Sequence, residues 1–178
     1  MNTIETEQKV LDVDVDKLLN ALDAIGAHKV YDDVRVITHF DTSSHSLRAK
    51  GESIKLTEES KLKLEHMRKS VNGQADAVKV FVSRKEETVE FLKRTGLVPV
   101  TEVRARRISY ELDGADIDID CFPGIPPFME VDAGGASAKM TELLDQLHVS
   151  DHEVIVATTP EIFARYNKDY FKEFGVRI

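Results

Sequence analysis

Apolar residues recur along the chain at two spacings, which predict helices and strands. After Asp14, the residues Val15, Leu18 and Leu22 follow the three-to-four-residue spacing of an amphipathic helix, and Gly26 is placed to end it. Strands are predicted where β-branched and aromatic residues dominate, or where apolar and polar residues alternate. The predicted strands are residues 4–10, 29–41, 46–52, 53–59, 61–68, 78–82, 98–112, 116–120 and 128–132, and the later predicted helices begin at a capping box on Ser83, at Ser137 and at Thr159, the last reaching Tyr170.

The predicted elements form a weak internal repeat. The order strand, helix, strand, strand occurs twice, first from Ile4 and again from Val78. Gly26 and Gly96 each follow the helix of one half, although few residues are identical between the halves.

The chain has 178 residues, which fits a single domain spanning residues 1–178.

Charged residues gather on one face of several predicted strands, opposite an apolar face. Asp116, Asp118 and Asp120 alternate with isoleucines, so their carboxylates share one face of the strand. The leucine-rich helices must pack on the apolar strand faces, which would leave the charged faces to line the inside of a curled sheet. Two interpretations stay open at this point: an α+β barrel with a charged interior, and a plain antiparallel sheet with salt bridges on its solvent-exposed face.

A charged interior implies a particular class of ligand. Glu5, Glu7 and Lys9 share one face of the first predicted strand, and two carboxylates so close in a cavity require a cation between or beside them. Carboxylate pairs suit Mg²⁺ or Mn²⁺, whereas Arg and Lys suit phosphate oxygens. The implied ligand is a polyphosphate with a divalent metal. Neither a Walker-type loop nor a Gly-x-Gly-x-x-Gly pattern occurs, which excludes P-loop and Rossmann sites.

Composition narrows the classes of partner. The net charge of −8 argues against binding of a nucleic-acid polymer through a broad basic face. Cys121 is the only cysteine, so no internal disulfide can form and a reducing compartment is expected. The first residues are polar and acidic and no apolar run has the length of a membrane span, so we expect a cytoplasmic protein with neither a secretory signal nor a membrane anchor.

Five short motifs, in order over roughly residues 4–135, resemble those of the CYTH family, the triphosphate tunnel metalloenzymes. The motifs are Glu5-x-Glu7-x-Lys9, Phe40-Asp41-Thr42, Leu47-Arg48-Ala49-Lys50, Arg107-Ile108-Ser109-Tyr110, and the acidic pairs Asp118-x-Asp120 and Glu130-x-Asp132. The resemblance implies an α+β fold with an eight-stranded antiparallel β-barrel, the tunnel, and helices packed outside it. It also implies that the last helix, with Tyr166 and Tyr170, covers one end of the tunnel or packs against the barrel.

The resemblance also implies roles for individual residues. Glu5, Glu7 and Lys9 are expected to be catalytic. Phosphate would be bound by Lys9, Arg48, Lys50, Lys55 and Arg107, and Mg²⁺ or Mn²⁺ by Glu5, Glu7, Asp118, Asp120, Glu130 and Asp132. Glu65 and Glu59 would be further tunnel residues. Glu59 stands where the family pattern has Lys, and Ala105 replaces a residue that is often Lys, so phosphate affinity and catalytic rate are in question.

Three functions follow from the resemblance. The first is hydrolysis of a triphosphate, either tripolyphosphate or an organic one such as ATP or thiamine triphosphate. The second is the class IV adenylyl cyclase reaction, in which ATP gives cyclic AMP and pyrophosphate. The third is a non-catalytic module that binds polyphosphate or nucleotide, which Glu59 and Ala105 favour. Whether the chain forms a homodimer is left open by the sequence.

Overall fold

A computed structural model of the chain describes residues 3–4, 7–69, 75–133 and 137–175. The chain forms two compact units. Unit 1 comprises residues 1–5, 35–104 and 169–178, and unit 2 comprises residues 6–34 and 105–168. Two long strands, β3 (His28–Asp41) and β7 (Val98–Leu112), contribute residues to both units. Glu5, a predicted catalytic and metal-binding residue, lies outside the described residues.

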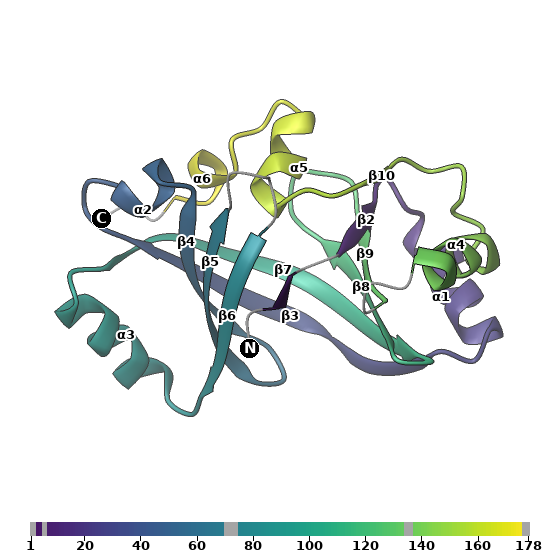
Figure 1. Cartoon of the computed structure of the whole chain (residues 1–178), viewed down its shortest axis with the longest axis horizontal. Coiled ribbons are helices and arrows are strands. Elements are labelled where there is room, and N and C mark those ends of the chain that lie inside the picture. Colours follow the sequence, from purple (N-terminus) through teal and green to yellow (C-terminus); the bar gives the residue numbers. More distant parts are fainter. Residues whose placement is uncertain (1–2, 5–6, 70–74, 134–136, 176–178) are drawn as a thin grey trace. The chain divides into compact units, whose positions relative to one another are not determined.

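Unit 1 is an antiparallel sheet with one helix packed on a face and two short helices at its margin (Figure 1). Its strands follow the order β1-β6-β5-β4-β3-β7. Besides the ends of β3 and β7, its elements are β1 (Thr3–Ile4), α2 (Ser46–Ala49), β4 (Glu52–Glu58), β5 (Leu62–Lys69), β6 (Ala75–Val82), α3 (Lys85–Arg94) and α6 (Tyr170–Glu173). Leu92 of α3 packs on Phe40 and Leu56, so this face of the sheet is apolar and buried.

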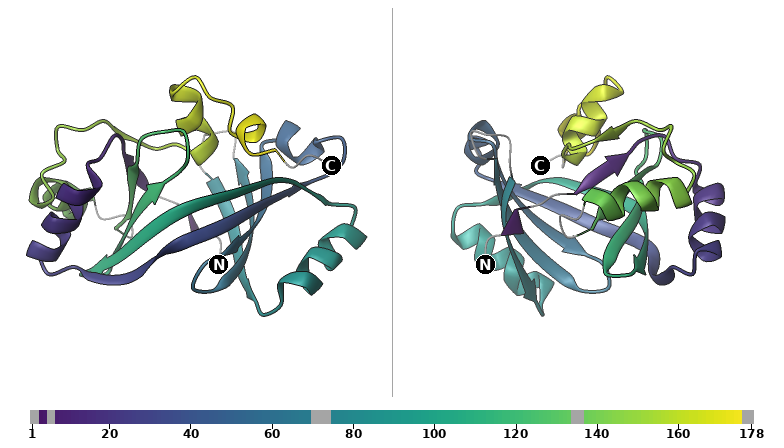
Figure 2. Two further views of the ribbon diagram at one scale, coloured as in Figure 1. Left: turned by 180° about the vertical axis from the view of Figure 1, so that it is seen from behind. Right: turned by 45° about the vertical axis from the view of Figure 1, so that its right-hand side comes forward.

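Unit 2 is built in the same way, with two helices on the apolar face of its strands (Figure 2). The strand order is β3-β7-β8-β9-β2-β10. Its further elements are β2 (Gln8–Val10), α1 (Val15–Ala24), β8 (Ala115–Cys121), β9 (Phe128–Asp132), α4 (Ser137–Gln146), β10 (Val154–Ile155) and α5 (Thr159–Arg165). Leu18 and Leu22 of α1 and Leu143 of α4 join Ile117 and Ile119 in one core. Each such side chain stabilises the fold by about 1.5–3 kcal/mol when fully buried.

The predicted internal repeat has a counterpart in the way two helices end. Gly26 follows α1 with φ +78° and Gly96 follows α3 with φ +89°. In both, the next residue donates its backbone N–H to a leucine carbonyl inside the helix: Ala27 to Leu22 and Leu97 to Leu92, each at 3.0 Å. This is the left-handed helix ending that glycine permits at no steric cost.

The α+β class with an antiparallel sheet is confirmed, but the predicted eight-stranded closed barrel is not what the described residues form. They form ten strands in an open order that ends at β1 on one side and at β10 on the other. The predicted first strand, residues 4–10, is divided into β1 and β2, with Glu7 in neither. No helix among the described residues has the length and apolar composition needed to cross a membrane.

The predicted strand over residues 46–52 is wrong except at Glu52, where β4 begins, and this changes the placement of Arg48 and Lys50. Residues 46–49 form the short helix α2, and Lys50 caps its C-terminal end. The buried Asp41 carboxylate accepts hydrogen bonds from the backbone N–H groups of Leu47 at 2.9 Å and Arg48 at 3.1 Å. Because these bonds satisfy N–H groups at the start of a helix, they favour helix over strand. Arg48 and Lys50 therefore do not share a strand face.

Two helix predictions are also corrected. Arg84, not Ser83, is the N-cap of α3, and its side chain makes no capping hydrogen bond. The predicted helix over residues 159–170 is two helices, α5 and α6. Asn167 between them has φ +56°, and Asp169 accepts hydrogen bonds from the N–H groups of Phe171 and Lys172 as the N-cap of α6. A left-handed residue ends a helix, and an N-cap aspartate begins the next one.

Candidate functional site

The charged face of unit 2 gathers most of the predicted metal-binding residues into one cluster, here called the Arg107 cluster. Cross-strand pairing places Arg107 opposite Asp120, Asp118 opposite Glu130, and Lys9 opposite Glu130. Side chains of directly paired residues lie on the same face of a sheet. The cluster consists of Glu7, Lys9, Arg107, Asp118, Asp120 and Glu130.

Arg107 is the centre of this cluster and is held by three carboxylates. Its Nε donates to Asp120 Oδ1 at 2.8 Å, and its Nη2 donates both to Asp120 Oδ2 and to Glu130 Oε2 at 2.6 Å. Its Nη1 donates to Asp118. The contact with Asp120 is bidentate, the geometry in which arginine binds carboxylates most strongly. Burial alone would lower the pKa of Arg107, but Asp120 and Glu130 outweigh burial and hold this pKa well above its usual range.

Lys9 joins Glu7 to the rest of the cluster. Its Nζ lies 2.9 Å from Glu130 Oε1 and 3.2 Å from Glu7 Oε2. Burial disfavours the charged form of Lys9, but the two carboxylates more than compensate and raise its pKa to about 12. Lys9 is therefore a fixed positive charge at neutral pH, and it orients Glu7, whose side chain is one-third exposed.

The Arg107 cluster has an excess of negative charge. It contains four carboxylates and two cations, which leaves a formal excess of two negative charges. Burial raises the pKa of Asp118, and the nearby Glu130 and Asp120 add to this effect against the opposing influence of Arg107. Two further carboxylates, Asp116 and the exposed Asp132, are paired directly opposite each other on the adjoining residues of β8 and β9.

The donor chemistry of this cluster fits Mg²⁺ or Mn²⁺, because its candidate ligands are carboxylate oxygens and one divalent cation would balance its formal excess of two negative charges. In the described residues, however, no group of three or more His, Cys, Asp or Glu side chains has the arrangement of a metal site. Asp120 and Glu130 are turned toward Arg107, and Glu130 also toward Lys9. Metal binding by Glu7, Asp118, Asp120, Glu130 and Asp132 thus stays a prediction.

Unit 1 carries a second cluster on the face of its sheet opposite α3, here called the Lys55 cluster. It consists of Lys55, Lys63, Lys79, Glu59 and Glu65. Glu65 is 3% exposed, and its carboxylate lies 2.7 Å from Lys55 Nζ and 3.7 Å from Lys79 Nζ. Lys63 Nζ lies 3.2 Å from Glu59. The cluster has three cations and two carboxylates, so its formal charge is opposite in sign to that of the Arg107 cluster.

Electrostatics in unit 1 favour an ionised carboxylate and a neutral histidine. Burial would raise the pKa of Glu65, but Lys55 and Lys79 outweigh burial and lower it. His39 on β3 is paired directly opposite Lys55 on β4. Burial, supported by the positive charge of Lys55, lowers the pKa of His39 to about 3, so its ring is neutral at pH 7.

The predicted site residues are thus divided between the two units. Lys55, Glu65 and Glu59 lie together in unit 1, while Arg48 and the exposed Lys50 lie on α2 and belong to neither cluster. Ala105 is buried and lies on β7 two residues before Arg107. Because side chains two residues apart share one face of a strand, Ala105 lies on the face of Arg107, at the position where the family pattern often has Lys.

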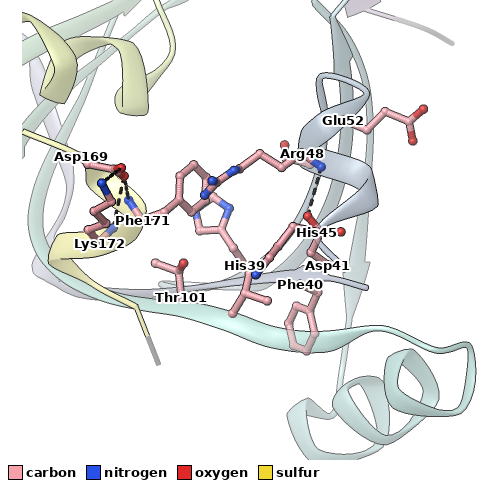
Figure 3. A pocket seen from close by; sticks show the side chains of 12 residues that line it. His39, Phe40, Asp41, His45, Arg48, Glu52, Thr101, Asp169, Phe171 and Lys172 are labelled. Atoms are coloured by element: carbon pink, nitrogen blue, oxygen red, sulfur yellow. Dashed lines mark hydrogen bonds and ion pairs between the residues drawn. The ribbon is translucent and has the colours of Figure 1, made fainter. Parts of the chain in front are cut away.

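Sequence reasoning missed a pocket in unit 1 between α2, α6 and the strands β3, β4 and β7 (Figure 3). Its volume is about 280 Å³. His39, Thr101 and Phe171 line it together with Arg48. Sequence signals existed for two of the lining residues: Arg48, which its motif predicts to bind phosphate, and His39, which shares a strand face with Asp41. No signal connected them with Thr101 and Phe171. Tyr170 packs within unit 1, where its hydroxyl lies 3.1 Å from His39 Nε2, and its covering of one end of a tunnel stays a prediction.

Comparison with known proteins shows what this chain is similar to. No family model matches the sequence, and no curated protein matches it. A protein from Vibrio parahaemolyticus, named as a proposed adenylate cyclase, has 19% sequence identity and a TM-score of 0.76, with 92% of this chain and 99% of that chain covered. These values show a shared fold.

Two further solved structures share the fold. A Bacillus halodurans protein, also named as a proposed adenylate cyclase, has 14% identity and a TM-score of 0.65, covering 91% of this chain and 98% of its own. A Hippeastrum protein, described as a proposed adenylyl cyclase with a dominant triphosphatase activity, has 14% identity and a TM-score of 0.66, covering 94% and 97%. The chain therefore has the fold of proteins named as proposed adenylate cyclases, one of which is described with a triphosphatase activity.

Proposed function

We propose that this protein is a Mg²⁺- or Mn²⁺-dependent enzyme that hydrolyses a triphosphate, either tripolyphosphate or an organic one. The observation that carries the proposal is the Arg107 cluster, in which four carboxylates are buried or half-buried around two cations. A buried excess of negative charge is costly unless a cation neutralises it. The Lys55 cluster supports the proposal, because its excess of positive charge suits phosphate oxygens. The Hippeastrum protein of the same fold has a triphosphatase activity.

The proposal assigns roles to the chain's own residues. Glu7, Asp118, Asp120, Glu130 and Asp132, together with Glu5, would hold the metal. A bound divalent cation would neutralise phosphate oxygens and lower the pKa of a coordinated water. Lys55, Lys63 and Lys79 would bind phosphate oxygens as positive charges. Glu7, oriented by Lys9, would accept a proton from the water that attacks the terminal phosphorus, while Lys9 and Arg107 would stabilise negative charge on the leaving oxygen.

The class IV adenylyl cyclase reaction is the second candidate, and the names of the Vibrio parahaemolyticus and Bacillus halodurans proteins favour it. In that reaction the ribose 3′-hydroxyl attacks the α-phosphorus, the proton passes to a base, and pyrophosphate leaves with the electron pair of the broken bond. The same residues would serve both reactions. The third candidate, a binding module without turnover, is favoured by Glu59, which forms an ion pair with Lys63 where a further lysine is expected.

One assay distinguishes the three candidates. The purified full chain is incubated with Mg²⁺ or Mn²⁺ and with tripolyphosphate or ATP, and the products are resolved by ³¹P NMR. We expect orthophosphate from the terminal phosphorus. Cyclic AMP with pyrophosphate would identify the cyclase instead, and tight metal-dependent binding without any product would identify the binding module.

The variant Glu7→Gln tests the assignment of Glu7. Because the amide can neither bind a hard cation as a carboxylate does nor accept the proton, we expect turnover to fall by at least about a hundredfold. The half-exposed position of Glu7 predicts an unchanged denaturation midpoint. Glu142→Gln, on the exposed face of α4, is the matched control and should retain the wild-type rate. An unchanged rate in Glu7→Gln would remove this residue from the site.

A further inference from the structure

The pocket of unit 1 has the size and the lining of a site for a small planar group. Its volume of about 280 Å³ is close to the lower end, about 300 Å³, of the range found for ligand pockets. The rings of His39 and Phe171 lie edge to face with their centroids 5.6 Å apart, and Phe171 also packs edge to face on Tyr170. The wall near α6 is thus aromatic, and aromatic walls favour flat ligands.

Two polar groups in this pocket lack partners of their own in the part of the chain that is described. Thr101 on β7 is fully buried, and its hydroxyl has no hydrogen-bond partner among these residues. The Arg48 guanidinium lies 4.7 Å from the centre of the Phe171 ring, and within the same residues it forms neither an ion pair nor a side-chain hydrogen bond. A buried hydroxyl without a partner is unfavourable, so a ligand that hydrogen-bonds with Thr101 would be favoured here.

The pocket adjoins the Lys55 cluster through His39. His39 lines the pocket and is the direct cross-strand partner of Lys55, so the two side chains lie on one face of the sheet. Lys55 in turn lies against Glu65. Because His39 is neutral, it does not attract phosphate, whereas Lys55 opposite it and the other lysines of the Lys55 cluster do. An aromatic wall and a cationic surface therefore meet within unit 1.

We infer that this pocket binds the planar, hydrogen-bonding ring of an organic triphosphate, such as the base of a nucleoside triphosphate, while the lysines of the Lys55 cluster bind its phosphates. The inference rests on the proposed function and specifies its substrate class. Tripolyphosphate has no ring that could fill the pocket or stack on Phe171. An organic triphosphate with an aromatic ring can do both, and a ring heteroatom can also hydrogen-bond with the Thr101 hydroxyl.

Binding measurements on the full chain test this inference. The probes are ATP and tripolyphosphate as methylene-bridged analogues that resist hydrolysis, with affinities measured by calorimetry in the presence of Mn²⁺. Thr101→Val keeps the side-chain shape but removes the hydroxyl. This variant should weaken binding of the ATP analogue about five- to tenfold, which is the effect of losing one hydrogen bond. The affinity for the tripolyphosphate analogue should stay unchanged. Thr38→Val is the matched control, because Thr38 is buried on the same strand as His39 but on its other face.

A second variant guards against an indirect effect of the first. Phe171→Leu should weaken the ATP analogue about tenfold through loss of stacking, whereas Phe91→Leu, on the exposed surface of α3, should change nothing. If the wild type binds neither analogue, the proposed function fails and the inference fails with it. If the wild type binds both, and Thr101→Val and Phe171→Leu weaken both equally or neither, the proposed function stands and the inference is overturned.

Discussion

The two units bury charge in opposite proportions on sheets that are built alike. In unit 2 one guanidinium is held by three carboxylates, and the cluster around it is negative. In unit 1 one buried carboxylate, Glu65, is surrounded by lysines, and the cluster is positive. Helices cover the opposite, apolar face of the strands in both units. The difference therefore lies in the side chains of the charged face and not in the architecture.

The choice of cation determines how rigid each cluster is. Arg107 is 8% exposed and uses its planar group to fix Asp118, Asp120 and Glu130 at once. Lys55 and Lys79 are about one-third and two-fifths exposed at the side chain, and a lysine ammonium makes no fixed fork. Unit 2 thus presents a fixed arrangement of carboxylates, while unit 1 presents positive charges that can adapt to a ligand.

Removing the central arginine should have the largest effect. Arg107→Met leaves the fully buried Asp120 and the neighbouring Glu130 without their main counter-charge, so we expect a loss of about 3–5 kcal/mol in the free energy of unfolding, measured in urea. Arg106→Met is the matched control, because Arg106 is half-exposed and Asp32 is its only ion-pair partner among the described residues. Its cost should stay below about 1 kcal/mol. Equal costs for the two variants would contradict the central place of Arg107.

Acid should act on unit 1 through His39, with a smaller effect. The pKa of His39 is lowered from 6.5 to about 3, so between these values the unfolded chain binds a proton that the folded chain does not. Stability is then lost as pH falls below 6.5, by about 1.4 kcal/mol per pH unit. His39→Gln keeps a hydrogen-bonding group beside Tyr170 but cannot titrate. Between pH 6.5 and pH 5 we expect the free energy of unfolding to fall by about 2 kcal/mol less in His39→Gln than in the wild type.

Urea unfolding of the wild type and His39→Gln at pH 5, 6 and 7 measures this difference. His28→Gln, on the exposed first residue of β3 in unit 2, is the control and should follow the wild-type pH profile. Parallel profiles for the wild type and His39→Gln would mean that His39 is not buried in the neutral form.

Reversing one charge in unit 1 should have the smallest effect. Glu59→Lys replaces the partner of Lys63 by a further positive charge, so the affinity for tripolyphosphate should rise about three- to tenfold at low salt. Glu86→Lys makes the same change of charge on α3, on the other face of the sheet, and should raise the affinity less. Equal gains from both variants would show a general effect of net charge and would place Glu59 away from the phosphates.

Local pattern predicted the strands well where burial alternates or is continuous. The predicted strands 98–112 and 128–132 have the bounds of β7 and β9, where β-branched and aromatic residues favour a strand. Asp14 is the N-cap of α1 as predicted, with its carboxylate accepting from the Lys17 N–H at 3.2 Å. The pairing of Asp118 and of Lys9 with Glu130 was not predicted, because it depends on strand order and register, which the local pattern does not contain.

Local pattern failed where a contact from elsewhere in the chain decides. Residues 46–49 alternate as a strand would, but Asp41 binds their backbone N–H groups and makes them a helix. The pocket escaped prediction because it brings together β3, β7 and α6, which lie far apart in the sequence. In contrast, the break at Asn167 and Asp169 had a visible signal, since Asn ends helices and Asp begins them.

The last residues of the chain complete a unit whose strands are made much earlier. Tyr170 reaches His39 across 131 positions, and Phe174 accepts a hydrogen bond from the Glu102 N–H at 3.2 Å. Because synthesis runs from the first residue to the last, a nascent chain has β3, β4 and β7 before it has one wall of the pocket. Contacts between such distant residues form late and slowly. Base recognition in this pocket would require α6, so a ligand there would stabilise the assembled unit and not its separate strands.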